Sequence, residues 1–254
     1  MRIGVLEQAG GDRGWFFLDG DRARRFDGSP FEGARLGSID ITWSPADLRA
    51  PVRPSKIVCV GRNYTAHAKE MGAEVPKEPL LFLKAPSSIV GPGGAVVLPK
   101  ESDRVEHEAE LGVVIGTRIR RASREDASRA IYGYTCVCDV TARDLQKKDG
   151  QWSRAKSFDS FCPVGPWIET ELDASDLEVR CAVDGELRQR GRTSQMIFDV
   201  PSLVAYVSAA MTLEPGDLIV TGTPEGVGPL LPGNRLTISI DGIGDLSVGV
   251  VGGE

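Results

Sequence analysis

Residues 105–116 read VEHEAELGVVIG, a stretch that begins with acidic residues and ends in a continuous apolar run. Alternate residues of a β-strand point to the same face of a sheet, so a strand here would place Glu106, Glu108 and Glu110 side by side. Carboxylates at the entrance of a buried strand repel one another unless a cation neutralises them. An edge strand whose glutamates face water has the same pattern, and this stretch alone leaves both interpretations open.

A further acidic residue, Asp139, follows the apolar and aromatic segment YGYTCVC at residues 132–138. An aspartate in this position is most often a turn or cap residue. Combined with Glu108 and Glu110, it would complete a ligand set made only of oxygen atoms, which favours Mg²⁺, Mn²⁺ or Ca²⁺ over Zn²⁺. The sequence contains two histidines, so a three-histidine zinc site is excluded.

The segment NYTAHAKEMG at residues 63–72 predicts a short helix that ends at Gly72. His67 and Glu70 are three residues apart and therefore share one helical face. Glu70 can orient the imidazole and the pair can accept a proton from water, although an exposed surface pair has the same spacing. The other histidine, His107, alternates with Glu108 on the predicted strand, so we expect it to point away from the carboxylates and to be structural.

Three basic residues lie in segments that border these motifs: Arg62 in GRNY, Arg143 in TARD and Lys156 in SRAKSF. Three carboxylates with one divalent ion leave a net negative charge, and an anionic substrate would add to it. Nearby lysine or arginine is therefore required if the acidic residues form a site. Taken singly, each of these side chains is more often an ordinary solvated cation.

The composition limits the class of protein. The chain has 254 residues, 41% of them hydrophobic, and a formal net charge of −6, which excludes a disordered chain and disfavours a nucleic-acid partner. The first twenty residues contain no continuous apolar segment, and the apolar stretch at 202–211 is about half of a bilayer span, so we expect a cytoplasmic protein without a membrane anchor. The five cysteines, without a CxxC, are expected to be reduced and mostly buried.

Short strand-like segments dominate the chain, and helices are predicted at 63–72, 123–131 and 200–211. Hairpins are predicted around Asp184-Gly185 and at 236–251. Regular alternation of strands and helices is missing, so the predicted class is α+β and mostly β rather than a Rossmann sheet or a TIM barrel. Residues 1–50 are expected to form a small β-rich N-terminal unit and residues 51–254 the main domain, with Pro51 and Pro54 in the predicted linker.

The chain lacks the motifs GxSxG, GxxxxGK[ST], HExxH and a strand-linked GxGxxG. The serine hydrolase, P-loop and nicotinamide-dependent classes therefore lose their main support.

Six motifs together resemble the fumarylacetoacetate hydrolase family. In chain order they are CVGRNYTAHAKEM, LLFLKAPSSIVGP, VEHEAELGVVIG, CDVTARDLQ, AKSFDSFCPVGP and DLIVTGTPEGVGP. The resemblance covers residues 56–250 and is greatest to the short members with a single catalytic domain, whereas residues 1–50 are only loosely similar to the N-terminal unit of those proteins. It implies a mixed β-sandwich or roll and a homodimer.

The resemblance assigns roles to individual residues. It implies Mg²⁺ or Mn²⁺ bound by Glu108, Glu110 and Asp139, with His67 and Glu70 positioning or deprotonating a water molecule and Lys156 as the active-site lysine. It implies contacts with the substrate from the following residues: Arg62, Tyr64, Arg143, Gln146, Gly222 and Thr223. Glu106 is expected behind the ligands or at the surface.

The activity implied is metal-dependent hydrolysis of a C–C bond in an acylpyruvate or another small anionic 2-oxo dicarboxylate, as in aromatic catabolism. The same motifs occur in 2-hydroxyhepta-2,4-diene-1,7-dioate isomerases and decarboxylases and in oxaloacetate decarboxylases, so these reactions are the alternatives. A non-catalytic metal-binding homologue and a purely structural metal protein are further alternatives. Substrate choice is expected to depend on loops at 73–79 and 144–154.

Overall fold

A computed structural model describes residues 1–253 of the chain. The helices are α1 (Thr65–Glu70), α2 (Arg124–Arg129), α3 (Arg143–Asp149), α4 (Ser153–Lys156) and α5 (Val200–Ala210), with 3₁₀ turns η1 (Pro30–Glu32), η2 (Pro45–Asp47), η3 (Pro86–Ser88) and η4 (Thr193–Gln195). The strands are β1 (Arg2–Glu7), β2 (Arg13–Asp19), β3 (Arg22–Phe26), β4 (Leu36–Thr42), β5 (Leu48–Arg49), β6 (Ile57–Gly61), β7 (Leu80–Lys84), β8 (Ile89–Val90), β9 (Ala95–Leu98), β10 (Val105–His107), β11 (Ala109–Ile115), β12 (Ile131–Cys138), β13 (Thr141–Ala142), β14 (Cys162–Glu169), β15 (Glu178–Val183), β16 (Glu186–Arg192), β17 (Leu218–Val220), β18 (Gly228–Pro229), β19 (Arg235–Ile240) and β20 (Gly244–Gly252).

One long, curled sheet organises the chain. Its order is β4-β3-β2-β1-β14-β12-β11-β17-β6-β7, with β5 paired to β1 and β8 paired to β14. Most neighbours are antiparallel, but β17 runs parallel to β6 and β14 parallel to β8, so the sheet is mixed. A second sheet has the order β16-β15-β19-β20-β9, and a small third sheet joins β13, β10 and β18. The predicted mostly-β α+β class is confirmed.

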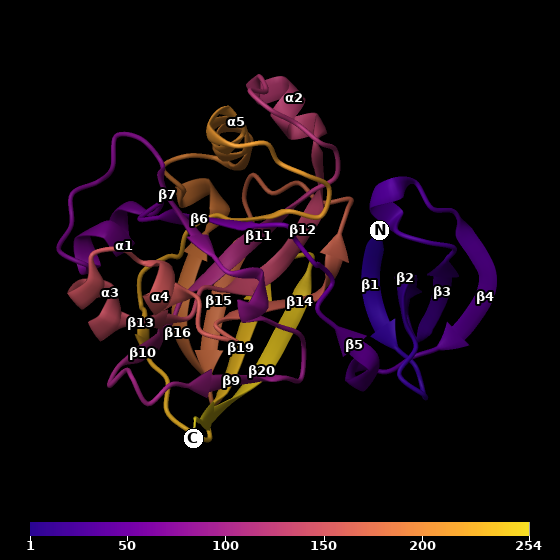
Figure 1. Cartoon of the computed structure of the whole chain (residues 1–254), viewed down its shortest axis with the longest axis horizontal. Coiled ribbons are helices and arrows are strands. Elements are labelled where there is room, and N and C mark those ends of the chain that lie inside the picture. The colour runs from indigo at the N-terminus through magenta and orange to yellow at the C-terminus, as the bar shows by residue number, and fades with distance from the viewer. Residues whose placement is uncertain (254) are drawn as a thin grey trace.

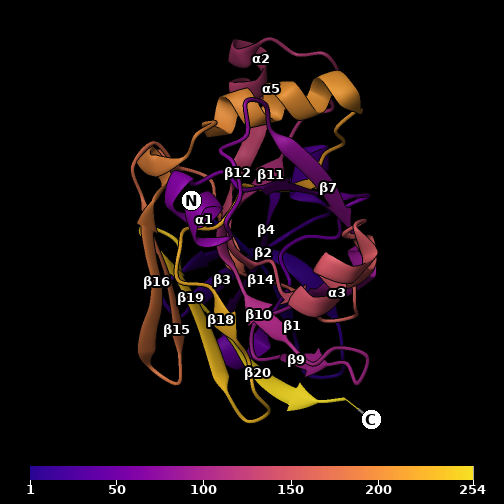
Figure 2. The ribbon, with the colours of Figure 1, turned by 90° about the vertical axis from the view of Figure 1, so that its left-hand side faces the viewer.

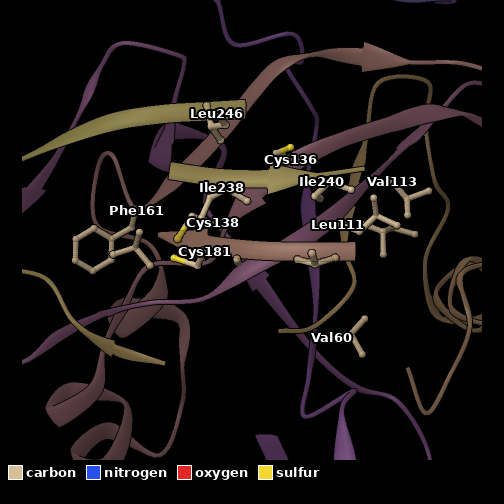
Figure 3. Close-up of a cluster of buried hydrophobic side chains, with 14 of the residues drawn as sticks. Val60, Leu111, Val113, Cys136, Cys138, Phe161, Cys181, Ile238, Ile240 and Leu246 are labelled. Atoms are coloured by element: carbon tan, nitrogen blue, oxygen red, sulfur yellow. The ribbon is translucent and has the colours of Figure 1, made fainter. Parts of the chain in front are cut away.

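The main core lies where the second sheet packs against the long sheet. Figure 3 shows Leu111 of β11 and Cys138 of β12 close to Cys181 of β15 and Ile238 of β19, all of them buried. All five cysteines are buried and unpaired, as the sequence predicted. This packing fixes β11 and β12, which are the two strands that lead to the acidic residues.

The N-terminal strands β1–β4 form an antiparallel meander at the edge of the long sheet, on the right in Figure 1. They are joined to the rest of the sheet because Arg2 and Ile3 of β1 pair with Glu169 and Ile168 of β14. The predicted division after residue 50 stays a prediction. Within residues 1–253, no helix has the length and apolarity needed to cross a bilayer.

The three predicted helices are present as α1, α2 and α5. The Ser123 side chain caps α2 by accepting from the Asp126 N–H, and Asp199 caps α5. Figures 1 and 2 show α2 and α5 side by side at the top of the molecule, above β11 and β12. The region 144–154, expected to be a loop, instead contains most of α3 and the first half of α4. These helices are too short to give an apolar periodicity that can be detected in the sequence.

The acidic segment is not one continuous strand. Glu108 lies between β10 and β11, and these two strands belong to different sheets. The hairpin around Asp184-Gly185 and the terminal hairpin β19–β20 are formed as predicted, with positive φ angles of 54° and 81° at Asp184 and Gly185.

Candidate active site

Strand register brings the three predicted carboxylates together. Ala109 of β11 pairs with Cys138 of β12, so the residues before and after that pair, Glu108 and Asp139, are neighbours, and the Asp139 N–H donates to the Glu108 carbonyl at 2.8 Å. Glu110 lies two residues along from Glu108. One oxygen atom from each of the three carboxylates lies within 4.8 Å of the other two, and all three side chains are buried.

The TGTP segment, residues 221–224, runs beside β11 and supports it. The Thr223 hydroxyl donates to the Ala109 carbonyl at 2.8 Å, and the Gly222 N–H donates to Oε2 of Glu110. The φ of Gly222 is 99°, and a Cβ there would lie 2.6 Å from the Cβ of Asn63, so glycine is required at this position. Gly222 therefore contacts Glu110, a predicted metal ligand, whereas the family resemblance predicted that Gly222 contacts the substrate.

Basic side chains hold the carboxylates in place. Lys156 Nζ donates to Glu108 Oε2 at 2.7 Å and to Asp139 Oδ2 at 2.6 Å, and Arg143 donates to Glu108 and, at 2.7 Å, to Glu106. Lys156 ends the short helix α4 and Arg143 begins α3, so both positions depend on helices that the sequence did not predict. Glu106 is buried and shares Arg143 with Glu108, which agrees with the first of its two expected positions and not with the surface.

Lys84 is a component of the site that sequence reasoning missed. It is the last residue of β7, it is buried, and its Nζ donates to Asp139 Oδ1 at 2.6 Å and to the Val140 carbonyl at 3.2 Å. A lysine that ends the apolar segment LLFLK was the available signal. Its partner, however, lies 55 residues away in the chain.

The predicted histidine–glutamate pair is formed. His67 Nδ1 lies 3.1 Å from Glu70 Oε2, while Glu70 Oε1 accepts from the Gly226 N–H at 2.9 Å. His67 is buried and lines the cavity described below, whereas Glu70 is exposed, so the pair extends from the cavity wall to the protein surface. The contact with Gly226 ties helix α1 to the loop that follows the TGTP segment.

These groups enclose a cavity of about 220 Å³. Its lining includes the three carboxylates and these other predicted residues: Arg62, His67, Arg143, Gln146, Lys156 and Thr223. It also includes Lys147 and Trp152, which lie in the 144–154 segment expected to affect substrate choice, and Met71 and Phe82, which the sequence did not single out. Tyr64, Glu70 and Gly222 do not contribute to this lining, and within residues 1–253 the buried Tyr64 hydroxyl has no hydrogen-bond partner.

Arg62 adopts an unusual backbone conformation at the cavity wall. Its φ is 58°, which is uncommon for a residue with a long side chain and is found mainly where the surrounding structure enforces it. Its guanidinium lies 5.9 Å from the centre of the Trp152 ring, and Trp152 packs edge-on against Phe82 at 5.2 Å. Neither Arg62 nor Lys147 forms an ion pair with another residue in the part of the chain that the structure describes.

The buried charges affect one another's ionisation. Burial alone would raise the pKa of Glu108, but Lys156 and Arg143 outweigh burial and lower it. Burial, with the negative charges of Asp139 and Glu108, raises the pKa of Glu110 well above its ordinary value. Among residues 1–253, Glu110 has no basic residue in salt-bridge contact. A buried carboxylate without a counter-charge is costly, and a bound cation would remove that cost.

The donor set fits a hard divalent cation. Three buried carboxylates provide oxygen ligands with no sulfur or nitrogen among them, which matches Mg²⁺ or Mn²⁺ and does not match a structural zinc site. The uncompensated Glu110 is the second observation in favour of an ion at this position.

Comparison with known families agrees with the family resemblance of the six sequence motifs. A family model described as "Fumarylacetoacetate (FAA) hydrolase C-terminal" matches residues 56–251. A protein of Dictyostelium discoideum named mitochondrial oxaloacetate decarboxylase is 47% identical over 195 residues, which are 74% of this chain and 89% of that protein. The oxaloacetate tautomerase YisK of Bacillus subtilis is 44% identical over 227 residues, 84% of this chain and 75% of that one.

Solved structures agree in fold over most or all of the chain. A 5-carboxymethyl-2-hydroxymuconate delta-isomerase from Mycobacterium smegmatis has 43% identity and a TM-score of 0.91, with both chains covered completely. A fumarylpyruvate hydrolase from Pseudomonas aeruginosa, solved in complex with Mn²⁺ and pyruvate, has 37% identity and a TM-score of 0.75 over 80% of this chain and 91% of that one. The named reactions of these proteins differ, while the fold is shared.

Proposed function

This chain belongs to the fumarylacetoacetate hydrolase family, and from that premise we propose that it is a divalent-metal-dependent enzyme acting on a small anionic 2-oxo acid through its enol or enolate. Oxaloacetate is the first candidate substrate. The observation that carries the proposal is that Glu108, Glu110 and Asp139 line the same cavity as His67 and Lys156. The three carboxylates proposed to bind the metal therefore share one cavity with a candidate base, His67, and a positively charged side chain, Lys156.

The size and charge of the cavity favour a small dianion. A volume of about 220 Å³ lies below the ~300–1,000 Å³ usual for drug-sized ligands. Four basic residues line it, namely Arg62, Arg143, Lys147 and Lys156, against three carboxylates. A bound divalent ion would add two positive charges, and a dicarboxylate such as oxaloacetate would balance much of the excess.

His67 is the proposed base. Glu70 engages Nδ1, which leaves Nε2 as the nitrogen that can accept a proton from a substrate carbon or from water. The Gly226 N–H holds the other oxygen of Glu70, so the pair is fixed before the substrate binds. When bound, the divalent ion would supply Lewis-acid polarisation of the 2-oxo group.

Hydrolysis of an acylpyruvate is the second candidate, because the same His67–Glu70 pair can activate a water molecule and because the P. aeruginosa relative is a hydrolase. Enol–keto exchange, loss of CO₂ and C–C hydrolysis all pass an electron pair into the same 2-oxo group, so one set of side chains can serve each of them. Isomerisation of 2-hydroxyhepta-2,4-diene-1,7-dioate is the third candidate, because a solved structure named as that isomerase, from Mycobacterium marinum, has 44% identity and a TM-score of 0.89 to this chain.

A substrate panel with Mg²⁺ and with Mn²⁺ tests the proposal. It would follow the ultraviolet absorbance of the enol and the formation of pyruvate from oxaloacetate, acetylpyruvate and fumarylpyruvate, and the isomerisation of the heptadiene-dioate. We expect metal-dependent turnover of oxaloacetate to exceed that of the other compounds. Activity that survives complete chelation, or no turnover of any of the four, would overturn it. A homodimer and a cytoplasmic location stay predictions, and light scattering in solution tests the first.

A further inference from the structure

Two lysines hold the two oxygens of Asp139, and only one of these lysines lines the cavity. Its Oδ1 accepts from Lys84 at 2.6 Å and its Oδ2 accepts from Lys156 at 2.6 Å. Lys156 lines the cavity, whereas Lys84 does not. Oδ1 is therefore occupied on the interior side of the carboxylate, and Oδ2 is the oxygen directed to the cavity side, where Glu108 also shares Lys156.

The position of Lys84 is set by the fold and not by its neighbours in sequence. It pairs with Ile57 in the β6–β7 ladder, and its ammonium also donates to the Val140 carbonyl at 3.2 Å. The side chain has 0% exposure, and Asp139 has 1%. Burying an ammonium in this way costs several kcal/mol unless a partner compensates, so the pair exists only because each charge offsets the other.

We propose that Lys84 is a positioning residue for metal binding: it holds Asp139 by Oδ1 so that Oδ2 is presented to the cavity beside Glu108 and Glu110. The inference rests on the proposed divalent-ion site and adds a residue that does not itself line that site. Lys156 contacts the carboxylate oxygens on the cavity side, so it competes with a bound cation. Lys84 contacts the other oxygen of Asp139 and does not compete.

The chain provides a matched control in a second lysine–aspartate pair. Lys56 precedes β6 and its ammonium pairs with Asp217, which has 0% exposure and precedes β17. This pair stabilises the same long sheet but contacts none of the three carboxylates. The Lys56 side chain is 21% exposed, so loss of Lys56 reports the cost of breaking a partly buried ion pair of the same sheet without disturbing Asp139.

The test measures Mn²⁺ affinity of the wild type, Lys84→Met and Lys56→Met by titration followed with electron paramagnetic resonance, well below each variant's Tm. We expect Lys84→Met to weaken Mn²⁺ binding about 10- to 100-fold, the usual range for losing a residue that orients a ligand, and Lys56→Met to leave it unchanged. A purely structural role predicts the opposite sign for Lys84, because removing a positive charge near the ion should strengthen binding.

The inference would be overturned if Lys84→Met bound Mn²⁺ as tightly as the wild type or more tightly. It would also be overturned if Lys56→Met weakened Mn²⁺ binding as much as Lys84→Met does. If Lys84→Met does not fold, Lys84→Gln, which is shorter and uncharged, is judged by the same criterion. The outcome is separable from that of the proposed function, since a wild type that binds Mn²⁺ but turns over no substrate would refute only the latter. A wild type that binds no Mn²⁺ would refute both.

Discussion

The two histidines of this protein have similar local surroundings and different positions in the fold. His67 and His107 are both buried, and each uses Nδ1 to contact a side-chain oxygen, Glu70 Oε2 at 3.1 Å and Gln189 Oε1 at 3.0 Å. His67 lines the cavity, whereas His107 is enclosed beside Cys181, whose sulfur lies 3.4 Å from its Nδ1. Burial and a hydrogen bond therefore do not distinguish a base from a structural histidine.

The partner's charge and access to the cavity make the difference. In the proposed mechanism the charged carboxylate of Glu70 would orient the His67 imidazole and stabilise charge that develops on it, whereas the Gln189 amide is neutral. Gln189 also accepts from the Ala109 N–H at 3.0 Å and donates to Thr223 at 2.8 Å, so His107 belongs to a network that stabilises β11 and the TGTP segment.

The largest expected effect is on kcat, which should fall when His67 is replaced but not when His107 is replaced. His67→Ala should lower kcat by about 10²- to 10⁴-fold, the usual contribution of a positioned general base, with little change in Tm. Steady-state kinetics on the preferred substrate of the panel measure it, and His107→Leu is the control. Wild-type turnover by His67→Ala would remove the base assignment.

The next effect concerns the cation. Mn²⁺ at about 100 times its Kd should raise the free energy of unfolding by roughly 2.7 kcal/mol through binding to the folded state alone. Glu110→Gln should abolish this stabilisation and His107→Leu should keep it, because only the first substitution removes a proposed ligand. Urea unfolding with and without Mn²⁺ measures both. Unchanged stabilisation in Glu110→Gln would argue against that ligand.

A smaller effect is expected on stability from the enclosed histidine. His107→Leu should lower the free energy of unfolding by about 1–3 kcal/mol, since it removes a buried hydrogen-bond partner of Gln189. The turnover of this variant should stay close to that of the wild type. Urea unfolding at pH 7 and steady-state kinetics test the two statements, and a loss of turnover without loss of stability would contradict the structural role.

The smallest expected effect is on the pH dependence of the stability that His107 contributes. Burial lowers the pKa of His107, so the folded protein keeps it neutral while the unfolded chain binds a proton below pH ~6.5. Its stabilising contribution is therefore complete above pH ~6.5 and is lost as the pH falls through the folded-state pKa. The stability difference between the wild type and His107→Leu should shrink from pH 7 to pH 5. A constant difference would show that His107 does not titrate in this range.

Local chemistry made part of the fold predictable. The Asp184-Gly185 hairpin requires residues that tolerate positive φ, and the α2 cap requires a serine followed by an acidic residue, so both could be read directly from the chain. Helices α3 and α4 could not be predicted in this way, because they are short and are held by tertiary contacts of Arg143 and Lys156.

The acidic triad shows how a prediction can be correct about proximity while the assumed local structure is wrong. Glu108 and Glu110 were expected together because they alternate on one strand, yet the strand is interrupted at Glu108. They still converge, because Glu108 is held beside Asp139 through the β11–β12 register. Whether the three residues bind a metal remains a prediction that the Mn²⁺ experiments address.

The sequence by itself determined which residue types are available for chemistry: three carboxylates near strand ends, one histidine–glutamate pair on a helix, and motifs in the order of one family. These features depend on spacing within a few residues, which the chain carries directly. Only the tertiary structure decided that Lys84 holds Asp139 and that Met71 and Phe82 line the cavity of the acidic residues. Such contacts join segments far apart in the chain, and they depend on the order of the strands in the sheet, which no single segment specifies.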